Sequence, residues 1–125
     1  MKQIITSTRG AAPIGPYSRA VKAGDTIYFS GTIALDDDGR LVQDSLEAET
    51  VQVMENIGRL LEDAGIGFSH VVKSSIFLDD MGHFSTVNEI YARYFSDAFP
   101  ARETVAVAGL PKGARVEISI IAYTG

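Results

Sequence analysis

The segment from Val71 to Leu78 constrains the fold most, because it predicts a strand that is apolar on both faces. Val72, Ile76 and Leu78 alternate along one face, and Val71 and Phe77 lie on the other. A strand with this composition is normally covered on both sides. The segment 104–108 shows a similar two-sided pattern, with valines alternating with alanines. Any fold for this chain must therefore supply cover for two faces of a sheet.

Two segments have the period of an amphipathic helix, and they can cover one of these faces. The first spans 44–64, with Asp44 as N-cap, Glu47 as its capping-box partner and Gly65 as the stop. Its apolar stripe is Leu46, Thr50, Val53, Ile57, Leu60, Leu61 and Ala64, and its polar face includes Glu49. The second spans 84–98 and ends before Pro100.

The remaining segments complete an α+β fold in a single domain, residues 1–125. Residues 2–8 form a short first strand, and the segments 19–23 and 26–30 form a hairpin around Gly24-Asp25. We expect a mixed sheet with both helices on one face. A chain of 125 residues then has nothing left for the other face. A second subunit in a closed symmetric oligomer would cover it.

Composition excludes several classes of function. The net charge of −5 and the pI near 4.9 argue against non-specific binding to nucleic acid or to an anionic membrane. There is no cysteine, and neither His70 nor His83 belongs to a metal-spacing motif, so no metal is expected. The run 34–42 has three adjacent Asp residues, which suit an acidic turn closed by Gly39 better than a calcium loop. Without a signal peptide or a long apolar run, we expect a cytoplasmic protein.

The C-terminal quarter contains the most reactive combination of residues. The segment 103–108 and the alternating segment 116–123 flank a turn-rich Gly109–Gly113, which predicts a β-hairpin about Pro111. That hairpin would bring Arg102 and Glu117 toward the same end. A fixed cation and a candidate base are the smallest set that could hold an acidic molecule and activate water. The alternative interpretation is a solvated surface ion pair.

Two further positions have two interpretations each. Tyr17 directly follows Pro16, which suits either a fixed binding position or core packing with a hydrogen-bonded hydroxyl. Gly31 follows the strand 26–30, so a ligand could approach its backbone closely, or the residue could form a bulge.

Several motifs together resemble the Rid (YjgF-like) family, and in particular its founding branch of deaminases. They are Gly15-Pro-Tyr-Ser18, Ser30-Gly31, Thr86-Val-Asn88, Pro100-Ala-Arg102, Leu110-Pro-Lys112 and Val116-Glu-Ile118. The resemblance implies a chorismate-mutase-like fold assembled as a homotrimer with sites between subunits. It also implies hydrolysis of 2-imino acids, such as 2-iminobutanoate and 2-iminopropanoate, to 2-keto acids and ammonia without a cofactor.

Residue by residue, the resemblance implies that Arg102 grips the substrate carboxylate and that Glu117 activates water. It places Tyr17, Ser30, Gly31, Asn88 and Thr104 along the substrate pocket. Two positions depart from the commoner pattern: Thr104, where this branch often has Cys, and Thr32, where Gln is commoner. These differences concern the range of substrates.

Two other functions stay open from the sequence. A non-catalytic metabolite-binding trimer would use Arg102 and the same cleft without needing Glu117 as a base. A ribonuclease acting on translation is also attributed to this family, although the acidic pI disfavours it.

Overall fold

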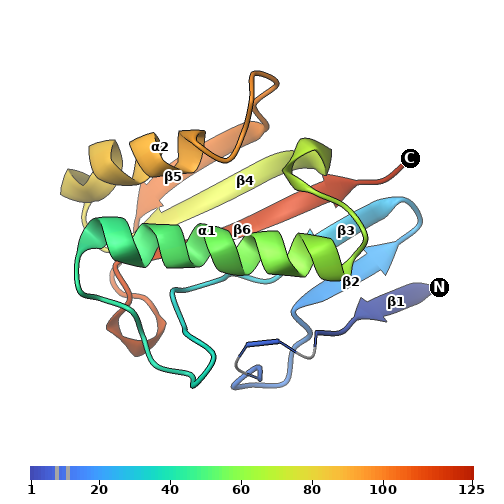
Figure 1. The fold of residues 1–125 in the computed structure, drawn as a ribbon, viewed down its shortest axis with the longest axis horizontal. Helices are drawn as coiled ribbons and strands as arrows, with labels where there is room; N and C mark the ends of the chain where they lie inside the picture. The colour runs from blue at the N-terminus through green and yellow to red at the C-terminus, as the bar shows by residue number, and fades with distance from the viewer. Residues whose placement is uncertain (8, 11) are drawn as a thin grey trace.

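The structure is a computed structural model that describes residues 1–7, 9–10 and 12–125. Six strands form one mixed sheet in the order β1-β2-β3-β6-β4-β5 (Figure 1). Their bounds are β1 Lys2–Ile5, β2 Ala20–Ala23, β3 Thr26–Phe29, β4 Val71–Leu78, β5 Ala101–Ala106 and β6 Val116–Tyr123. All neighbouring pairs are antiparallel except β4 and β5, which are parallel.

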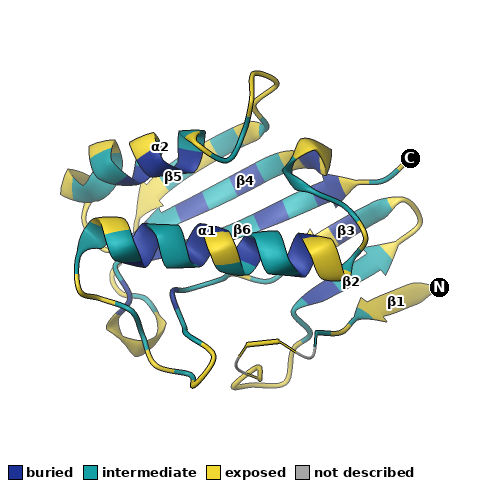
Figure 2. Cartoon of the chain, viewed as in Figure 1, coloured by how far each residue is buried: buried dark blue, intermediate teal, exposed yellow. Residues whose placement is uncertain are grey.

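Both α-helices, α1 (Leu46–Asp63) and α2 (Phe84–Ala92), lie over the same face of this sheet (Figure 1). Short 3₁₀ turns at Phe68–His70, Met81–His83 and Pro111–Gly113 connect the elements. The core fills the layer between helices and sheet, as the buried residues in Figure 2 show. The predicted α+β mixed sheet with two helices on one face is confirmed.

The central strand β6 explains how the sequence builds this layer. Every second residue from Val116 to Ala122 is buried toward the helices, while Glu117 and Ser119 point to the other face. The strand lies between β3 and β4, so its apolar face is at the middle of the core.

A β-bulge corrects the predicted phase of β4. Val71 pairs with Ala122 and Lys73 with Ile121, so Val72 is an extra residue without a place in the ladder. The bulge turns Val71 into the core, whereas Val72 is exposed. The prediction that Val72 shares a face with Ile76 and Leu78 was therefore wrong.

The predicted C-terminal hairpin is also wrong. β5 and β6 are not neighbours, because β4 lies between them and pairs with both. Period-two alternation shows which residues share a face, but it does not identify the partner strand. The connection from residue 107 to residue 115 crosses the end of β4 instead of reversing beside β5.

The ends of the elements were predicted in part. The hairpin at Gly24-Asp25 is confirmed, and Gly65 ends α1 with a positive φ of 78°. The cap of α1 is Ser45 instead of Asp44: the Ser45 side chain accepts a hydrogen bond from the backbone N–H of Ala48. The second helix is shorter than predicted. It ends at Ala92, after which Tyr94 and Phe95 turn inward to pack against Phe68.

One predicted surface carboxylate is instead buried. Glu49 on α1 is fully enclosed and accepts hydrogen bonds from the backbone N–H of Arg115, at 2.8 Å, and from its guanidinium Nε, at 2.6 Å. This buried charge-assisted pair fastens the start of β6 to the first turn of α1.

The sheet face away from the helices remains partly apolar and uncovered in the single chain. Tyr28, Val72, Val105 and Tyr123 each expose two-fifths or more of their surface there. A partner subunit on this face, and with it the homotrimer, stays a prediction.

Candidate functional site

Glu117 lines a cavity of about 410 Å³, called below the Glu117 pocket. The cavity lies among described residues between Ser7 and Arg19, the chain leaving β3, one side of α1 and Pro111. Tyr17, Ser30, Gly31 and Thr32 also line it. Five residues that were singled out from the sequence therefore come together: Glu117, Tyr17, Ser30, Gly31 and Thr32.

The chain that leaves β3 holds the Glu117 side chain closely. Thr32 and Ile118 exchange two backbone hydrogen bonds, of 2.8 and 3.0 Å, which fix residues 31 and 32 beside Glu117. A Cβ added at Gly31 would lie 2.5 Å from Glu117 Oε2 and 2.8 Å from its Cδ. A side chain at position 31 would therefore force the Glu117 carboxylate to move, a reason for glycine that neither sequence interpretation gave.

Ser30 ties this segment to the start of β2. Its backbone N–H donates to the Arg19 carbonyl at 2.9 Å, and its hydroxyl donates to the Ser18 carbonyl at 2.7 Å. The Ser30 hydroxyl is thus already engaged as a donor within the chain, and its oxygen can still accept a hydrogen bond.

The Glu117 carboxyl has an unusual environment for a strand residue. Burial raises its pKa above the ordinary value for glutamate, because a charged carboxylate loses hydration there. Among the described residues, Glu117 takes part in no ion pair. A carboxylate of this kind is a stronger base than one at the surface, which suits proton abstraction.

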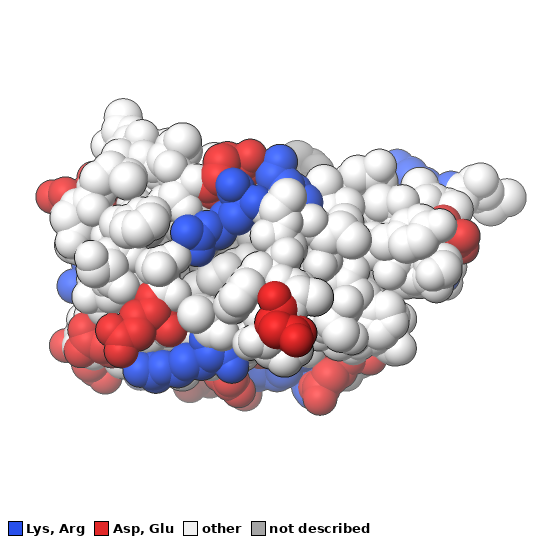
Figure 3. Space-filling view, turned by 90° about the horizontal axis from the view of Figure 1, so that it is seen from above, with Lys and Arg blue, Asp and Glu red and all other residues white. Residues whose placement is uncertain are grey.

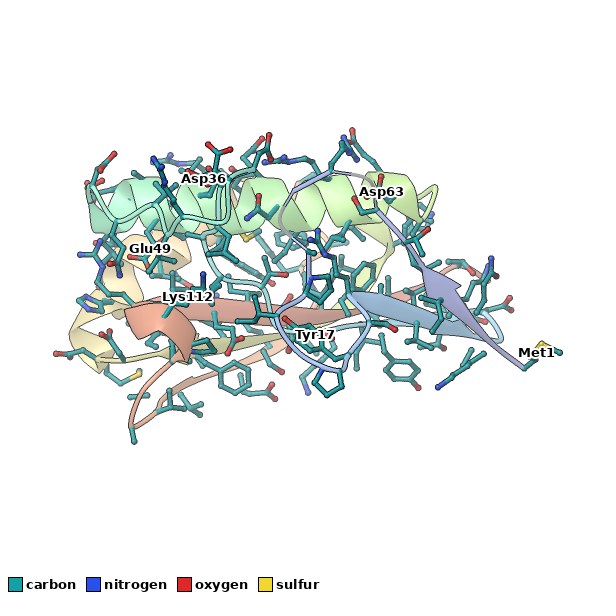
Figure 4. All side chains as sticks on the ribbon, turned by 90° about the horizontal axis from the view of Figure 1, so that it is seen from below. Met1, Tyr17, Asp36, Glu49, Asp63 and Lys112 are labelled. Carbon is teal, nitrogen blue, oxygen red and sulfur yellow. The ribbon has the colours of Figure 1, made fainter. Side chains whose placement is uncertain are left out.

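Tyr17 lies at the mouth of this region, on the segment that connects β1 to β2. Figure 4 shows this segment running from α1 near Asp63 to Tyr17 at the level of the sheet. About half of the Tyr17 surface is exposed, so the core-packing interpretation of this residue is wrong.

Arg102, Asn88 and Thr104 form a separate set, called below the Arg102 group. The Arg102 guanidinium carbon lies 5.1 Å from the ring centre of Tyr91 and 5.7 Å from that of Phe84, both on α2. Asn88 is four residues after Phe84 and three before Tyr91, so it shares their side of the helix. Thr104 lies two residues after Arg102 and faces the same way.

The surroundings of Arg102 include a buried, hydrogen-bonded tyrosine and one polar atom without a partner among the described residues. Tyr91 is buried, and its hydroxyl donates to the Ser74 hydroxyl oxygen at 2.8 Å. Burial raises the pKa of Tyr91, which keeps the ring neutral beneath the cation. The Thr104 hydroxyl is buried and finds no hydrogen-bond partner in the described part of the chain. Buried polar groups seldom stay unpaired, so this hydroxyl is free to meet a ligand or a partner chain.

The two sets lie on opposite faces of the sheet. Arg102 pairs with Ser74 on β4, and Glu117 pairs with Phe77 on the same strand. Ser74 and Phe77 are three residues apart and point in opposite directions. Within one chain, Arg102 and Glu117 therefore do not form a joint site. They do not form a surface ion pair either, so both interpretations drawn from the sequence are wrong for the single chain.

Sequence reasoning missed the supports on which each set rests. For Arg102 they are Phe84 and Tyr91: the helical period places both on one apolar face of the second helix, but it does not show that this face lies against Arg102. For the Glu117 pocket they are Arg9 and Arg19, from the connection between β1 and β2, and Arg59, from α1; the three have no shared motif.

Other kinds of site find no support in the residues described. No group of three or more His, Cys, Asp or Glu side chains among them could hold a metal ion. No helix in those residues is long and apolar enough to cross a membrane. Basic and acidic side chains form small, separate groups on the face drawn in Figure 3. The cytoplasmic location stays a prediction.

Comparison with known proteins identifies the family. The family model described as endoribonuclease L-PSP matches residues 8–124. A mouse protein named 2-iminobutanoate/2-iminopropanoate deaminase is 46% identical over 126 residues, which cover all of this chain and 93% of that protein. A Pyrococcus horikoshii RutC family protein is 43% identical over 98% of both chains.

The solved structures agree with the sequence comparisons. The crystal structure of a Rid family protein of unknown function from Yersinia pestis superposes with a TM-score of 0.94 at 43% identity, covering 98% of this chain and 99% of that one. The chain belongs to the Rid (YjgF-like) family, which the sequence motifs predicted.

Proposed function

We propose that this protein is a hydrolase that converts 2-iminobutanoate and 2-iminopropanoate to the corresponding 2-keto acids and ammonia. The observation that carries the proposal is the half-buried Glu117 carboxylate, raised in pKa, at the wall of a cavity in a chain of this family. The names of the curated relatives supply the substrate class.

The reaction makes modest chemical demands. Glu117 accepts a proton from a water molecule as the water oxygen attacks C2 of the imine. The imine nitrogen takes up this proton, which gives a neutral carbinolamine. Glu117 then accepts the proton of the carbinolamine hydroxyl and passes it to the amino nitrogen as the C–N bond breaks, so ammonia departs and a 2-keto acid remains. One water is consumed, no electrons are transferred and the carboxylate base is restored, so the residues need no cofactor.

The substrate carboxylate needs a fixed cation, and Arg102 is the proposed one. Its planar guanidinium suits a bidentate contact to a carboxylate. Asn88 and Thr104 would line the same end of the substrate, with Thr104 gaining the hydrogen bond that it lacks in the single chain. Tyr17, Ser30 and Gly31 would line the end near Glu117.

We further propose that the working form is a homotrimer in which Arg102 of one protomer faces Glu117 of the next. The two residues lie on opposite faces of the sheet, so one chain does not bring them to the same substrate. The partly exposed apolar face away from the helices is available for the contact. A closed ring repeats one head-to-tail contact and completes every site.

An experiment with two inactive variants tests the enzyme and the shared site together. Arg102→Ala and Glu117→Gln chains carry different affinity tags, are co-expressed, and mixed assemblies are purified through both tags. In every mixed trimer selected by both tags, one of the three head-to-tail contacts, about a third, would pair an intact Arg102 with an intact Glu117 on a neighbouring chain. The measurement is keto-acid release from 2-iminobutanoate, compared with each variant alone.

We expect activity to return in the mixed assemblies, although each variant alone is nearly inactive. Lack of recovery in folded mixed oligomers would overturn the shared site, because it would show that Arg102 and Glu117 of neighbouring chains do not act on one substrate. If wild-type protein does not accelerate hydrolysis but still binds 2-ketobutyrate, the metabolite-binding alternative replaces the deaminase.

A further inference from the structure

The Glu117 pocket holds more positive charge than hydrolysis of small imines requires. Three arginines line it: Arg9, Arg19 and Arg59. Glu117 is the only carboxylate residue that lines it among the described residues. The cavity of about 410 Å³ also lies in the size range of sites for drug-sized ligands, whereas 2-iminobutanoate is a four-carbon acid.

Two of the three arginines are already neutralised by the chain. Arg9 contacts Glu62 at 3.3 Å and Asp63 at 2.9 Å, and it donates a further hydrogen bond to the Arg59 carbonyl. Arg59 contacts Asp37 at 2.9 Å. Both side chains therefore hold the wall of the pocket together and have little charge to offer a ligand.

Arg19 differs from both, because it has no carboxylate partner in the described part of the chain. Its one hydrogen bond runs from Nη1 to the Arg9 carbonyl oxygen, at 3.1 Å. A guanidinium has five N–H donors, so most of those of Arg19 are left for a ligand. Its position is well defined, since the Arg19 carbonyl accepts the backbone N–H of Ser30 at 2.9 Å.

Two residues, Ser30 and Gly31, link Arg19 to the proposed base Glu117. Ser30 holds Arg19, Gly31 follows Ser30, and Gly31 packs against the Glu117 carboxylate. Because Arg19 and Glu117 line the same cavity, a substrate whose reacting carbon lies beside Glu117 can extend a side chain through that cavity toward Arg19. The substrate α-carboxylate would occupy the other end, at Arg102.

We propose that Arg19 recognises a carboxylate at the end of the substrate side chain, so that the pocket accepts imines of acidic amino acids. This inference rests on the proposed deaminase function and deepens it: Arg19 is a specificity-determining residue. A second carboxylate at Arg19 forms a charge-assisted contact that a neutral amide of the same size lacks.

The test compares three product mimics that separate charge from size. They are 2-ketobutyrate, 2-ketoglutarate and 2-ketoglutaramate, the neutral amide of the same length as 2-ketoglutarate. Calorimetry measures their binding to wild type, Arg19→Gln, Arg19→Lys and Arg59→Gln. Arg59→Gln is the matched control, because Arg59 also lines the Glu117 pocket but is paired with Asp37. The rates of hydrolysis of the corresponding imines, made in situ by oxidation of the amino acids, provide a second measurement.

We expect wild type to prefer 2-ketoglutarate over its amide by about 10- to 100-fold, the usual range for a charge-assisted contact. Arg19→Gln should abolish most of that preference, Arg19→Lys should retain part of it, and Arg59→Gln should leave the ratio close to the wild-type value. The kcat/KM ratio for the two imines should change in the same direction.

Several outcomes would overturn the inference. The first is equal affinity of wild type for 2-ketoglutarate and its amide. The second is an equal loss of affinity for all three ligands in Arg19→Gln, which is expected if Arg19 only supports the loop. A wild type that fails to hydrolyse 2-iminobutanoate but retains the acid-over-amide preference would instead reject the deaminase function and keep the charge recognition. Thermal midpoints of the variants show whether each is folded before its ratio is interpreted.

Discussion

The two halves of the proposed site are built in different ways. Glu117 stands on a central strand, but its surroundings come from irregular segments: the chain leaving β3, the residues around Tyr17 and the turn at Pro111. Arg102 stands on an edge strand, but its surroundings come from regular structure, the α2 face that presents Phe84 and Tyr91. The half proposed to perform the chemistry thus depends on backbone hydrogen bonds made by irregular segments, and the half proposed to bind the carboxylate depends on side-chain packing.

The difference suggests separate tolerances to substitution. Small changes of backbone should harm the Glu117 half most, because Gly31 leaves no space beside the carboxylate. Changes of side-chain shape should harm the Arg102 half most, because its cation lies over two aromatic rings.

The largest effect is expected at the base itself. Glu117→Gln keeps the shape of the side chain but removes the proton acceptor, so kcat for 2-iminobutanoate should fall by about 10²–10⁴. The measurement is steady-state kinetics on a variant shown to be folded and assembled as wild type. Glu47→Gln, the same change at an exposed carboxylate on α1, is the control. Unchanged kcat in Glu117→Gln would leave this residue without a catalytic role.

A smaller loss is expected when the planar cation is replaced. Arg102→Lys keeps the charge but loses the bidentate fork and the contact with the two rings, so 2-ketobutyrate binding should weaken by about 1.5–3 kcal/mol. Calorimetry with wild type and with Arg93→Lys, an exposed position on the segment after α2, provides the comparison. Wild type should also reject the amide of 2-ketobutyrate. Equal binding of acid and amide would exclude Arg102 as the carboxylate anchor.

Gly31→Ala tests the close packing around Glu117. The added methyl group must displace the carboxylate, and misplacement by about 1 Å can cost up to 10²-fold in rate, so we expect kcat to fall by roughly 10- to 100-fold. Binding of 2-ketobutyrate should change less than kcat, because Arg102 lies on the other face of its own chain. Gly109→Ala is a matched control, since nothing lies within 4 Å of a Cβ at that position. Similar kinetics for the two alanine variants would show that the pocket adapts and that the contact is unimportant.

The smallest effect is a displacement of the pH profile. Burial raises the pKa of Glu117, and a base works when deprotonated, so activity should be lost as pH falls through this raised pKa. A nearby cation favours the charged carboxylate and lowers the same pKa. If Arg102 of a neighbouring chain lies beside Glu117, Arg102→Ala should therefore move the acid limb of kcat/KM to higher pH. Superimposable limbs for wild type and variant would indicate that the two residues do not meet.

Much of the fold could be predicted from the sequence, because apolar periodicity reports burial directly. The strand 71–78, the hairpin at Gly24-Asp25 and the main helix were all found in this way. The order of strands could not be predicted, since β4 and β6 have patterns that fit several neighbours. The burial of Glu49 was also missed, because its partner Arg115 lies 66 residues away and a helical Glu normally faces solvent.

The candidate site was predictable only as a set of residues. Motif resemblance named Arg102 and Glu117, but their placement on opposite faces depends on the registers of β5 and β6 against β4, which the motifs do not report. The positive charge of the Glu117 pocket could not be predicted from the sequence either, because it depends on which residues meet in the folded chain. Arg9, Arg19 and Arg59 meet only after the chain folds, and their difference lies in which of them has a carboxylate partner.

The bulge at Val72 gives β4 one position at which a residue can be lost without changing the register of the strand. Val71 and Lys73 already pair with consecutive residues of β6, so a chain without Val72 would keep every later side chain on its present face. A single-residue deletion at any position from 73 to 78 would instead exchange the two faces for part of the strand. Viable insertions and deletions in β4 should therefore concentrate at the bulge, leaving the spacing from Lys73 to Leu78 constant.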